Sequence, residues 1–407
     1  MKFIMDAIDK AASEAQQIID KEAAGDPAIR KVMRLVHDFI QHNRVMCYGG
    51  TAINNIIPEK DRFYDFSVDI PDYDFFSENP QKHSVELADK LVHAGIKNVE
   101  VKPGIHLGTF KVFADYTGVA DISHLDKPIF EKLWKESIVK EHIHYVPPNF
   151  LRMSIYLELS RPRGFVERWK KVYSRLLLLN KEYPVECSRE EEFHARKVDS
   201  ELKISIEDFL IKEHVILLGF NASTLQDKEK HEWLLPLDLL ATPDSAEHVA
   251  NTIAGMFREH GKVKTREYEE YAELLPAHHD VVDNSNKLMV RVYETNACHS
   301  YHEMSNGLHI ASIPTLLNFF FAMIYADKHF MESTSRQRIV CSAQKLVELA
   351  NENSKRRFKL LTPITCLGKQ KDLLDMKREK SELYSKLSKH RQSAEFLKFF
   401  FSYTPKK

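Results

Sequence analysis

The stretch MCYGGTAINN, residues 46–55, decides how the first half of the chain is interpreted. A short apolar run ends in Gly49 and Gly50, and a hydroxyl residue, Thr51, comes directly after them. The pattern predicts a strand that turns through the glycines into a short helix. Missing side chains would let the backbone approach a phosphate group, and the N–H groups at a helix N-terminus favour anions. A glycine pair taken alone marks only a turn, so a nucleotide site here requires metal-binding carboxylates close to it.

Two aspartates come after the turn in DIPDYDFFS, residues 69–77. Asp72 and Asp74 are two residues apart, and in a β-strand such residues point to the same face. Neighbouring carboxylates repel each other unless a cation neutralises them. A hard divalent ion with oxygen ligands, Mg²⁺ or Mn²⁺, is the natural partner. We therefore predict that Asp72 and Asp74 are metal ligands.

A third carboxylate, Asp121, lies in the apolar strand pattern GVADIS, residues 118–123. The strand comes after a hairpin signal, and Asp115 borders that turn and is assigned to it. Three carboxylates on adjacent strands could hold two ions about 4 Å apart, which clamp the attacking and leaving oxygens of a displacement at phosphorus. The sequence predicts a two-ion site formed by Asp72, Asp74 and Asp121.

Bulk properties set few limits on the chain of 407 residues. Its formal net charge is -1, so any nucleic-acid binding must come from local patches. The five cysteines are scattered and odd in number, and we interpret them as free thiols in a reducing compartment. The start of the chain lacks a signal-peptide pattern. The most apolar run, residues 313–326, is too short to cross a bilayer, so no membrane association is predicted.

The order of predicted elements indicates an α+β chain in which the second half repeats the first. HVILLGFNAST, residues 214–224, corresponds to residues 44–54, so that Gly219-Phe220 replaces Gly49-Gly50. A chance succession of similar elements is the alternative. The predicted segments are N-terminal helices at 1–43, a catalytic domain at 44–183, a linker at 184–204, a degenerate copy at 205–350 that keeps only Asp238, and a basic helical tail at 351–407.

Four segments together resemble one known family: YGGTAIN, DYDFFS, GTFKVFADYTGVADIS and LELSRPRGFVERWKKVYSRLLLLN. They are similar to the poly(A) polymerase catalytic subunits of large nucleocytoplasmic DNA viruses, within the DNA polymerase beta-like nucleotidyltransferase superfamily. The resemblance is strongest over residues 45–182, although Phe165 departs from the small or acidic residue expected there. It implies a mixed sheet with flanking helices and the addition of adenylates from ATP to RNA 3′ ends.

The resemblance also implies roles for individual residues. Asp72, Asp74 and Asp121 would be the catalytic metal ligands, and the residues that hold the nucleotide would be Gly49, Gly50 and Thr51. One ion would activate the RNA 3′-hydroxyl for in-line attack on the α-phosphate, and the other would stabilise the departing pyrophosphate. The choice of ATP over other triphosphates depends on the resemblance alone.

Two basic segments are candidates for binding phosphates. In residues 161–182 we predict that Arg168 and Lys171, three apart on one helical face, bind the nucleotide. Residues 355–407 contain 15 Lys or Arg against 5 Asp or Glu. The predicted RNA-binding residues are Arg161, Arg163, Lys355, Arg356 and Arg357. The alternatives are a solvated helix face for the first segment, and for the second a tail that docks its aromatic end on the core or on a partner.

Two histidine-containing motifs are assigned no chemistry. CHSYH, residues 298–302, lacks a fourth zinc ligand at a recognisable spacing, and HHD, residues 278–280, is interpreted as a surface loop. Two other functions remain open: a synthase of oligonucleotides or cyclic dinucleotides, and a non-catalytic RNA-binding processivity subunit. The resemblance further implies a possible homodimer or a processivity or cap-methyltransferase subunit as partner, and a location in the infected host's cytoplasm or the virion.

Overall fold

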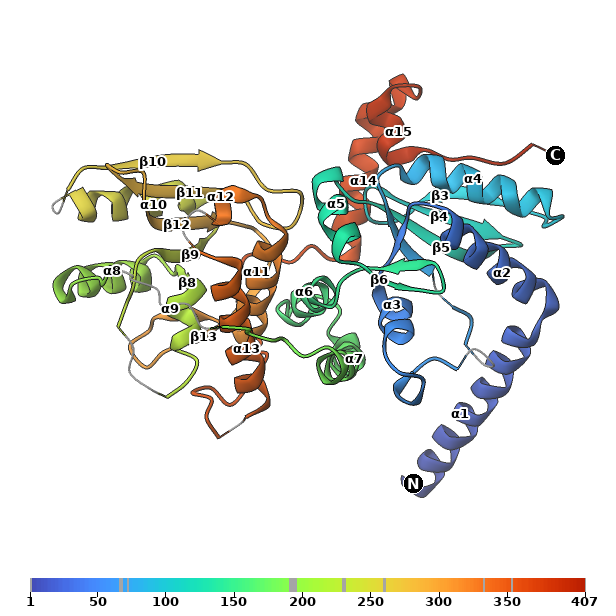
Figure 1. The fold of residues 1–407 in the computed structure, drawn as a ribbon, viewed down its shortest axis with the longest axis horizontal. Helices are drawn as coiled ribbons and strands as arrows, with labels where there is room; N and C mark the ends of the chain where they lie inside the picture. The colour runs from blue at the N-terminus through green and yellow to red at the C-terminus, as the bar shows by residue number, and fades with distance from the viewer. Residues whose placement is uncertain are drawn as a thin grey trace. The chain divides into compact units, whose positions relative to one another are not determined.

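The computed structural model divides into two compact units (Figure 1). It describes residues 2–65, 69–71, 73–189, 196–228, 232–258, 261–331, 334–352 and 354–406. The first unit contains residues 1–147 and 373–407, and the second contains 148–372. The helices at 148–182 therefore belong to the second unit rather than grouping with the predicted catalytic domain. The basic tail is divided, since its part from residue 373 onward belongs to the first unit.

The chain begins with two helices that part where the sequence predicts, α1 (Lys2–Gly25) and α2 (Pro27–His42). The Asp26 side chain accepts a hydrogen bond from the Ala28 backbone N–H at 2.7 Å, and Pro27 occupies the first turn of α2, where it displaces no hydrogen bond. One face of α2 is buried, including Val36 and Phe39. The Phe39 ring lies 6.3 Å from that of Phe75, so α2 covers one face of the first sheet.

The first sheet is mixed, with the strand order β3-β4-β5-β2-β1-β7-β6. Strand β2 runs parallel to β5 and antiparallel to β1, and β1 runs parallel to β7. The helix α4 (Pro80–His93) packs on β4 and β5. The strands are β1 (Met46–Cys47), β2 (Tyr73–Ser77), β3 (Glu100–Pro103), β4 (Thr109–Ala114), β5 (Thr117–His124), β6 (Ile138–Lys140) and β7 (Ile143–Tyr145), with α3 (Gly49–Ile56) after β1 and α5 (Lys127–Glu136) after β5.

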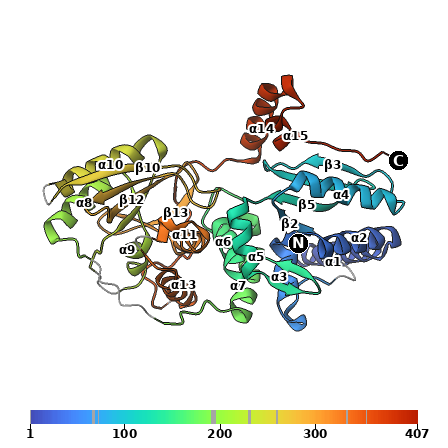
Figure 2. The same ribbon diagram turned by 45° about the horizontal axis from the view of Figure 1, so that its top comes forward.

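The second sheet has the strand order β10-β11-β12-β9-β8-β14-β13-β15. Helix α10 (Pro243–Arg258) packs on β10, β11 and β12, as Figure 2 shows, and α8 (Ser200–Lys212) contacts α10. The strands are β8 (Ile216–Leu218), β9 (Leu237–Ala241), β10 (Val263–Tyr268), β11 (His278–Asp283), β12 (Leu288–Glu294), β13 (His299–Glu303), β14 (His309–Ala311) and β15 (Cys366–Leu367).

The first seven strands of the second sheet repeat the order of the first sheet, β8 taking the place of β1, β9 of β2 and β12 of β5. The sense of pairing repeats as well: β9 is parallel to β12 and antiparallel to β8, and β8 is parallel to β14. A chance succession of elements would not reproduce both order and sense. The repeat predicted from the sequence is therefore confirmed as a repeat of topology.

Buried helices complete the second unit. Every residue of α11 (Ile313–Tyr325) is buried, because it packs against both α6 (Pro148–Leu159) and α13 (Arg336–Asn351). The other helices of this unit are α7 (Trp169–Glu182), α9 (Gly219–Thr224) and α12 (Lys328–Met331). Within the described residues, no helix combines the length and apolarity that crossing a membrane requires.

The aromatic end of the tail docks within the first unit. Phe396 and Phe400 of α15 (Ala394–Phe400) are buried, and α14 (Leu373–Leu387) contacts the same helix. Tyr403 bridges to Val101 of β3, and its hydroxyl donates to Asp89 at 2.8 Å. Of the two alternatives for this run, docking on the core is the one observed.

Two predictions from the sequence are wrong. The cysteines are not all free: Cys187 is bonded to Cys341 and Cys298 to Cys366, which leaves Cys47 as a buried free thiol. The partners are 154 and 68 residues apart, so spacing in the sequence could not show the pairing. The segment at 278–280 is not a surface loop, because it begins the buried strand β11.

Candidate active site

The turn between β1 and α3 requires glycine at position 49. Gly49 has φ +72°, a conformation that L side chains rarely adopt. A Cβ atom at this position would lie 2.9 Å from Oδ2 of Asp74. The backbone therefore passes directly beside a carboxylate of the neighbouring strand, and the predicted glycine turn and the predicted metal ligand are adjacent.

Helix α3 is anchored at its C-terminal end. The Lys140 ammonium donates to the carbonyl oxygens of Asn55 and Ile56 at 3.1 and 2.6 Å. The buried Asn54 side chain accepts from the backbone N–H groups of Phe63 and Tyr64, each at 2.9 Å, which orders the chain after the helix. These contacts hold α3 with its N-terminus at the Gly49 turn.

The N-terminal turn of α3 contains the other two predicted nucleotide-binding residues. Gly50 is half-buried, whereas Thr51 is only 2% exposed. The N-cap residue, Tyr48, makes no side-chain hydrogen bond to the helix. The N-cap side chain therefore does not supply the acceptor that a Ser, Thr, Asp or Asn would, and N–H groups at a helix N-terminus are what an anion binds.

Two of the three predicted metal ligands face each other across parallel strands. Asp74 of β2 and Asp121 of β5 are directly opposite in the register. Both are half-buried, whereas Tyr73 and Phe75 on the other face of β2 are buried in the core. Asp72, the third, lies outside the described residues. The alternation of β2 thus puts an acidic face toward the site and an apolar face toward α2.

An aromatic pair lies on the same face and was not identified from the sequence. The rings of Tyr48 and Phe76 stack with centroids 3.9 Å apart and planes 13° from parallel. The Tyr48 hydroxyl is 3.0 Å from Oγ of Ser123, which is two residues from Asp121 and opposite Phe76. The alternation of β2 could have put Phe76 on the face of Asp74, but only strand pairing brings Tyr48 and Ser123 to it.

A lysine already neutralises one carboxylate. Lys111 of β4 is directly opposite Asp121 in the antiparallel register, and its ammonium forms an ion pair with Oδ2 of Asp121. The two side chains are 40% and 21% exposed, so solvent and ions can reach the pair. The sequence contained this residue in an alternating strand pattern, but its partner could be identified only from the register.

The predicted basic residues near α7 lie in the second unit. Arg163, Arg168 and Lys171 are exposed, and the Arg168 guanidinium lies 3.4 Å from a carboxylate oxygen of Glu158. Arg161 differs, because it is half-buried and burial lowers the pKa of its guanidinium. The side chains of the exposed three are accessible to a phosphate group in solvent.

The tail residues differ among themselves. Lys355 is exposed and pairs with Glu352 at 2.6 Å. The Arg357 side chain instead donates to the backbone oxygens of Leu225 and Asp227 at 2.9 and 2.8 Å, so it holds two chain segments together. Arg356 forms an isolated bridge with Asp227.

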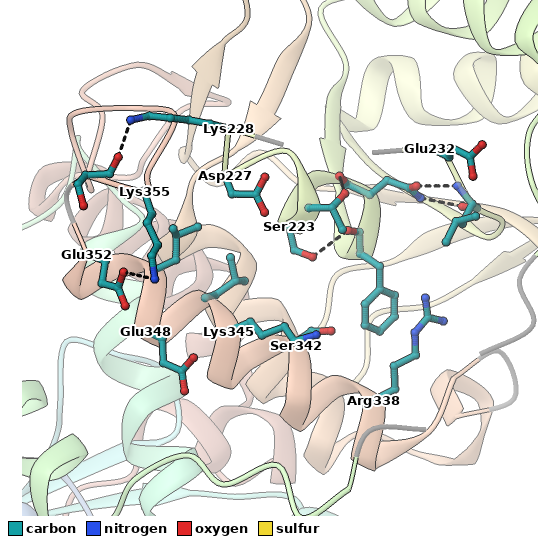
Figure 3. Close-up of a pocket in the computed structure, with 17 residues that line it drawn as sticks. Ser223, Asp227, Lys228, Glu232, Arg338, Ser342, Lys345, Glu348, Glu352 and Lys355 are labelled. Atoms are coloured by element: carbon teal, nitrogen blue, oxygen red, sulfur yellow. Dashed lines mark hydrogen bonds and ion pairs between the residues drawn. The ribbon is translucent and has the colours of Figure 1, made fainter. Parts of the chain in front are cut away.

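Lys355 also lines a cavity of about 760 Å³ beside α9 and α13 (Figure 3). Lys345, Glu348 and Arg338 of α13 border the same space. Its charged lining residues are Lys228, Arg338, Lys345 and Lys355 against Asp227, Glu232, Glu348 and Glu352. Because these charges balance, the charge of this cavity alone does not select an anion.

The second copy keeps the glycine turn, but neighbouring side chains block access to its backbone. Gly219 has φ +66°, and a Cβ there would lie 2.8 Å from Cβ of Asp238, so Asp238 corresponds to Asp74. Asp238 is 8% exposed, and burial raises its pKa to about 6. Phe220 stands where the first copy has the second glycine, and the Arg338 guanidinium lies 3.8 Å from the centre of its ring. A phosphate could not approach this backbone as it could at Gly49.

The third carboxylate of the second copy is replaced by a cation. Arg291 is opposite Asp238 in the parallel register, the position of Asp121 in the first copy. Its partner across the antiparallel register is Asp280, where the first copy has Lys111. The two charges are thus exchanged relative to the Lys111–Asp121 pair of the first copy. Arg291 donates two hydrogen bonds of 2.8 Å to Asp280, and both residues are 1% exposed.

This inversion also explains a cluster that has the spacing of metal ligands. Within the described part of the chain, ligand atoms of His278, Asp280 and His329 lie within 4.8 Å of one another. The Arg291 guanidinium occupies the centre of the cluster, since it binds both Asp280 oxygens and lies 3.0 Å from Nε2 of His329. Both Asp280 oxygens are thus taken by a buried guanidinium, so the second copy does not fit a metal. In the first copy the ammonium of Lys111 pairs with one oxygen of Asp121 at a solvent-accessible position, and Asp74 and Asp121 fit a metal.

Comparison with known proteins matches this arrangement to one family. Residues 34–164 match the family described as Poly(A) polymerase catalytic subunit. The putative poly(A) polymerase catalytic subunit of Acanthamoeba polyphaga mimivirus is 29% identical over 161 residues, which cover 39% of this chain and 27% of that protein. The corresponding protein of an African swine fever virus isolate (Tick/Malawi/Lil 20-1/1983) is 29% identical over 187 residues, 42% of this chain and 37% of that protein.

The sequence matches span about a third of the length of these relatives. A similarity of fold extends further. The crystal structure of the Megavirus polyadenylate synthase superposes with a TM-score of 0.80 at 20% identity, and the match covers all of this chain and 86% of that one. The predicted α+β fold, a mixed sheet with flanking helices followed by a second α/β unit, is therefore confirmed. So is the resemblance that the sequence indicated: this chain is similar to the viral poly(A) polymerase catalytic subunits, by sequence across residues 34–164 and by fold along its whole length.

Proposed function

We propose that the chain is a template-independent nucleotidyltransferase that adds AMP from ATP to RNA 3′ ends. One observation carries the proposal: Asp74 lies opposite Asp121 and directly beside the Gly49 turn. Two carboxylates that could bind a metal ion therefore lie in the same small region of the sheet as a backbone turn that could bind a phosphate. The similarity to proteins named as poly(A) polymerase catalytic subunits supports ATP and RNA as the substrates.

Asp74 and Asp121, with Asp72 from its place in the sequence, would hold two Mg²⁺ or Mn²⁺ ions. The donor set fits such ions, because it consists of carboxylate oxygens on adjacent strands. The ions, when bound, neutralise the triphosphate and make the RNA 3′-hydroxyl easier to deprotonate. The ion pair of Lys111 with Asp121 balances that carboxylate's charge at the half-open face.

The chain's own groups would orient the nucleotide. Backbone N–H groups at the start of α3 donate to phosphate oxygens, and Gly49 leaves room for them because it has no side chain. Asp121 would lie on the side of the RNA primer and would help to accept the proton of the 3′-hydroxyl. Arg168 and Lys171 would bind the triphosphate.

The RNA backbone would contact exposed basic side chains. Arg163 and Lys355 have the exposure for this role, and the half-buried Arg356 and Arg357 are further candidates for it. A second copy of this chain, or a processivity or cap-methyltransferase subunit, stays a prediction from the resemblance. So does a location in the infected host's cytoplasm or in the virion.

The test is extension of a labelled RNA primer by the purified chain, with each ribonucleoside triphosphate separately and with Mg²⁺ or Mn²⁺. We expect long products with ATP only, and a loss of about 10²- to 10³-fold in rate for Asp74→Asn or Asp121→Asn, on the scale that electrostatic groups contribute at active sites. Asp238→Asn is the matched control, because it removes the corresponding carboxylate of the second copy, and it should retain extension.

Other outcomes would select other functions. RNA binding without extension under any condition would indicate a non-catalytic processivity subunit. Short products made without a primer would indicate a synthase of oligonucleotides or cyclic dinucleotides. Equal loss of extension in Asp238→Asn and Asp74→Asn would contradict the assignment of the active site to the first copy.

A further inference from the structure

A second cavity, apart from the glycine turn, lies inside the second unit and has a volume of about 390 Å³. It is bordered by the end of α6, by β12 and β13, and by α11. Leu157 and Phe319 form apolar parts of its wall, and Arg161, His299 and Asn318 supply polar parts. Its size is that of a mononucleotide site rather than of an extended groove.

Arg161 is a permanent cation at this wall without a carboxylate partner. Its Nε atom is buried, and among the described residues it has no hydrogen-bond partner. No ion pair within 4.0 Å joins its guanidinium to any carboxylate in the described part of the chain. Buried charges in proteins are ordinarily paired, because taking a charge out of water is costly. An uncompensated guanidinium at a cavity wall therefore indicates that an anion belongs there.

His299 is the second group that lacks a partner. The residue is 3% exposed, its ring packs edge-on against Phe319 at 5.4 Å, and its Nδ1 atom has no hydrogen-bond partner within the described residues. Burial and the charge of Arg161 lower its pKa to about 3, so the ring is neutral near pH 7. A neutral imidazole can still donate one N–H, and Nδ1 is a buried ring nitrogen that could carry that proton.

The backbone around His299 is held firmly. Its strand β13 pairs with β15, so that His299 is opposite Leu367, and the neighbouring Cys298 is bonded to Cys366. The Ser300 N–H donates to the carbonyl oxygen of Ser160, next to Arg161, at 2.8 Å. The two groups are thus fixed relative to each other, as a preformed binding site requires.

We propose that this cavity binds a phosphate group, with the Arg161 guanidinium and the His299 Nδ1–H donating hydrogen bonds to its oxygens. A guanidinium matches phosphate through its planar fork of donors. The phosphate could be that of a free mononucleotide or of an RNA strand. The proposal goes beyond the proposed catalytic function and does not depend on it, because every group involved belongs to the second unit.

Acidic residues at the cavity do not oppose this assignment. Glu270 and Glu273 are exposed, so solvent screens their charges. Glu294 is directed to another partner, because one of its oxygens lies 3.4 Å from Nε2 of His279. The Asn318 amide donates to the Met153 carbonyl oxygen at 3.2 Å and keeps its own oxygen available to a donor on the ligand.

The experiment is calorimetric titration of the full chain in EDTA with inorganic phosphate, AMP and a five-nucleotide oligoadenylate. The titrated protein also contains Asp74→Asn and Asp121→Asn, so that nothing is bound through metal at the first copy. In this background we expect one mononucleotide per chain, and at least tenfold weaker binding in Arg161→Gln. Arg258→Gln, which removes an exposed arginine of α10, is the matched control and should bind as the parent does.

Two further variants guard against misfolding. Arg161→Lys keeps the charge and should bind more tightly than Arg161→Gln, and His299→Leu should weaken binding while keeping the ring's volume filled.

Tighter binding of AMP or phosphate than of oligoadenylate would identify a free nucleotide as the ligand, and the reverse would identify RNA. Absence of binding for all three probes, or equal affinity in the parent and in folded Arg161→Gln, would overturn the proposal. Primer extension by the otherwise unchanged chain is measured separately, so failure of the catalytic proposal would not be mistaken for failure of this one.

Discussion

Replacing Gly49 with alanine is the sharpest test of how the first copy works. An L residue at φ +72° costs about 1–2 kcal/mol in stability relative to glycine. The new Cβ atom would stand 2.9 Å from Oδ2 of Asp74, whereas ordinary contact begins at 3.4 Å. The carboxylate or the turn must therefore move by about 0.5 Å. Since a 1 Å misplacement at a reacting centre can reduce a rate about 10²-fold, we expect extension to slow by about 10- to 100-fold.

Gly219→Ala is the matched control, because the second copy has the same turn. Its φ is +66°, and the added Cβ would crowd Asp238 even more closely, 2.8 Å from the Asp238 Cβ. Both variants should melt at lower temperature, by about 2–8 °C for a loss of 1–2 kcal/mol in a unit of this size, and Gly219→Ala by at least as much as Gly49→Ala. The assay is RNA primer extension with ATP, normalised to the folded fraction from thermal melting.

The reasoning predicts a separation of stability from activity. Gly49→Ala should lose rate per folded molecule, and Gly219→Ala should lose stability alone. Full activity in folded Gly49→Ala would refute the claim that the position of Asp74 beside the glycine turn matters to the reaction. A comparable loss of rate in folded Gly219→Ala would show instead that any strain in either sheet is transmitted to activity.

Three further predictions concern the second unit. Arg291→Met leaves the buried Asp280 charge with only His278 and His329 beside it, so the free energy of unfolding in a denaturant titration should fall by about 3–5 kcal/mol, and an unchanged midpoint would contradict the inverted pair. Cys298→Ser removes the bond to Cys366, which closes a loop of 68 residues, and should cost about 2–5 kcal/mol under oxidising conditions but nothing once the parent is reduced. Burial lowers the pKa of His278 to about 4, so its folded form resists protonation. The unfolded chain then binds more protons between pH 6.5 and 4, and stability contributed by the neutral ring falls by up to about 3 kcal/mol as pH decreases through that window, a slope that His278→Gln should reduce.

The local sequence determined much of the active-site assignment, because its signals come from residues close together in the chain. Backbone conformation explains two of these signals, the GG turn after a short strand and the hairpin before Asp121. Two-residue periodicity explains the third, the spacing of Asp72 and Asp74. The repeat could also be recognised, since residues 214–224 preserve the apolar pattern and the glycine of residues 44–54. Gly49, Asp74 and Asp121 are accordingly close together in the first unit.

Strand register and long-range packing decided the rest. Lys111 meets Asp121, and Arg291 meets Asp280, because neighbouring strands align residue by residue, and a shift of one residue would turn each side chain to the opposite face. No spacing in the sequence indicates that Cys298 reaches Cys366, or that the half-buried Arg161 lies near His299 with a buried Nε that has no partner among the described residues. Local conformational preferences therefore identified which residues could do chemistry. Only tertiary structure showed which charges are neutralised within the chain, as at Asp280, and which have no partner among the described residues, as at Arg161, because that balance depends on neighbours brought together by folding.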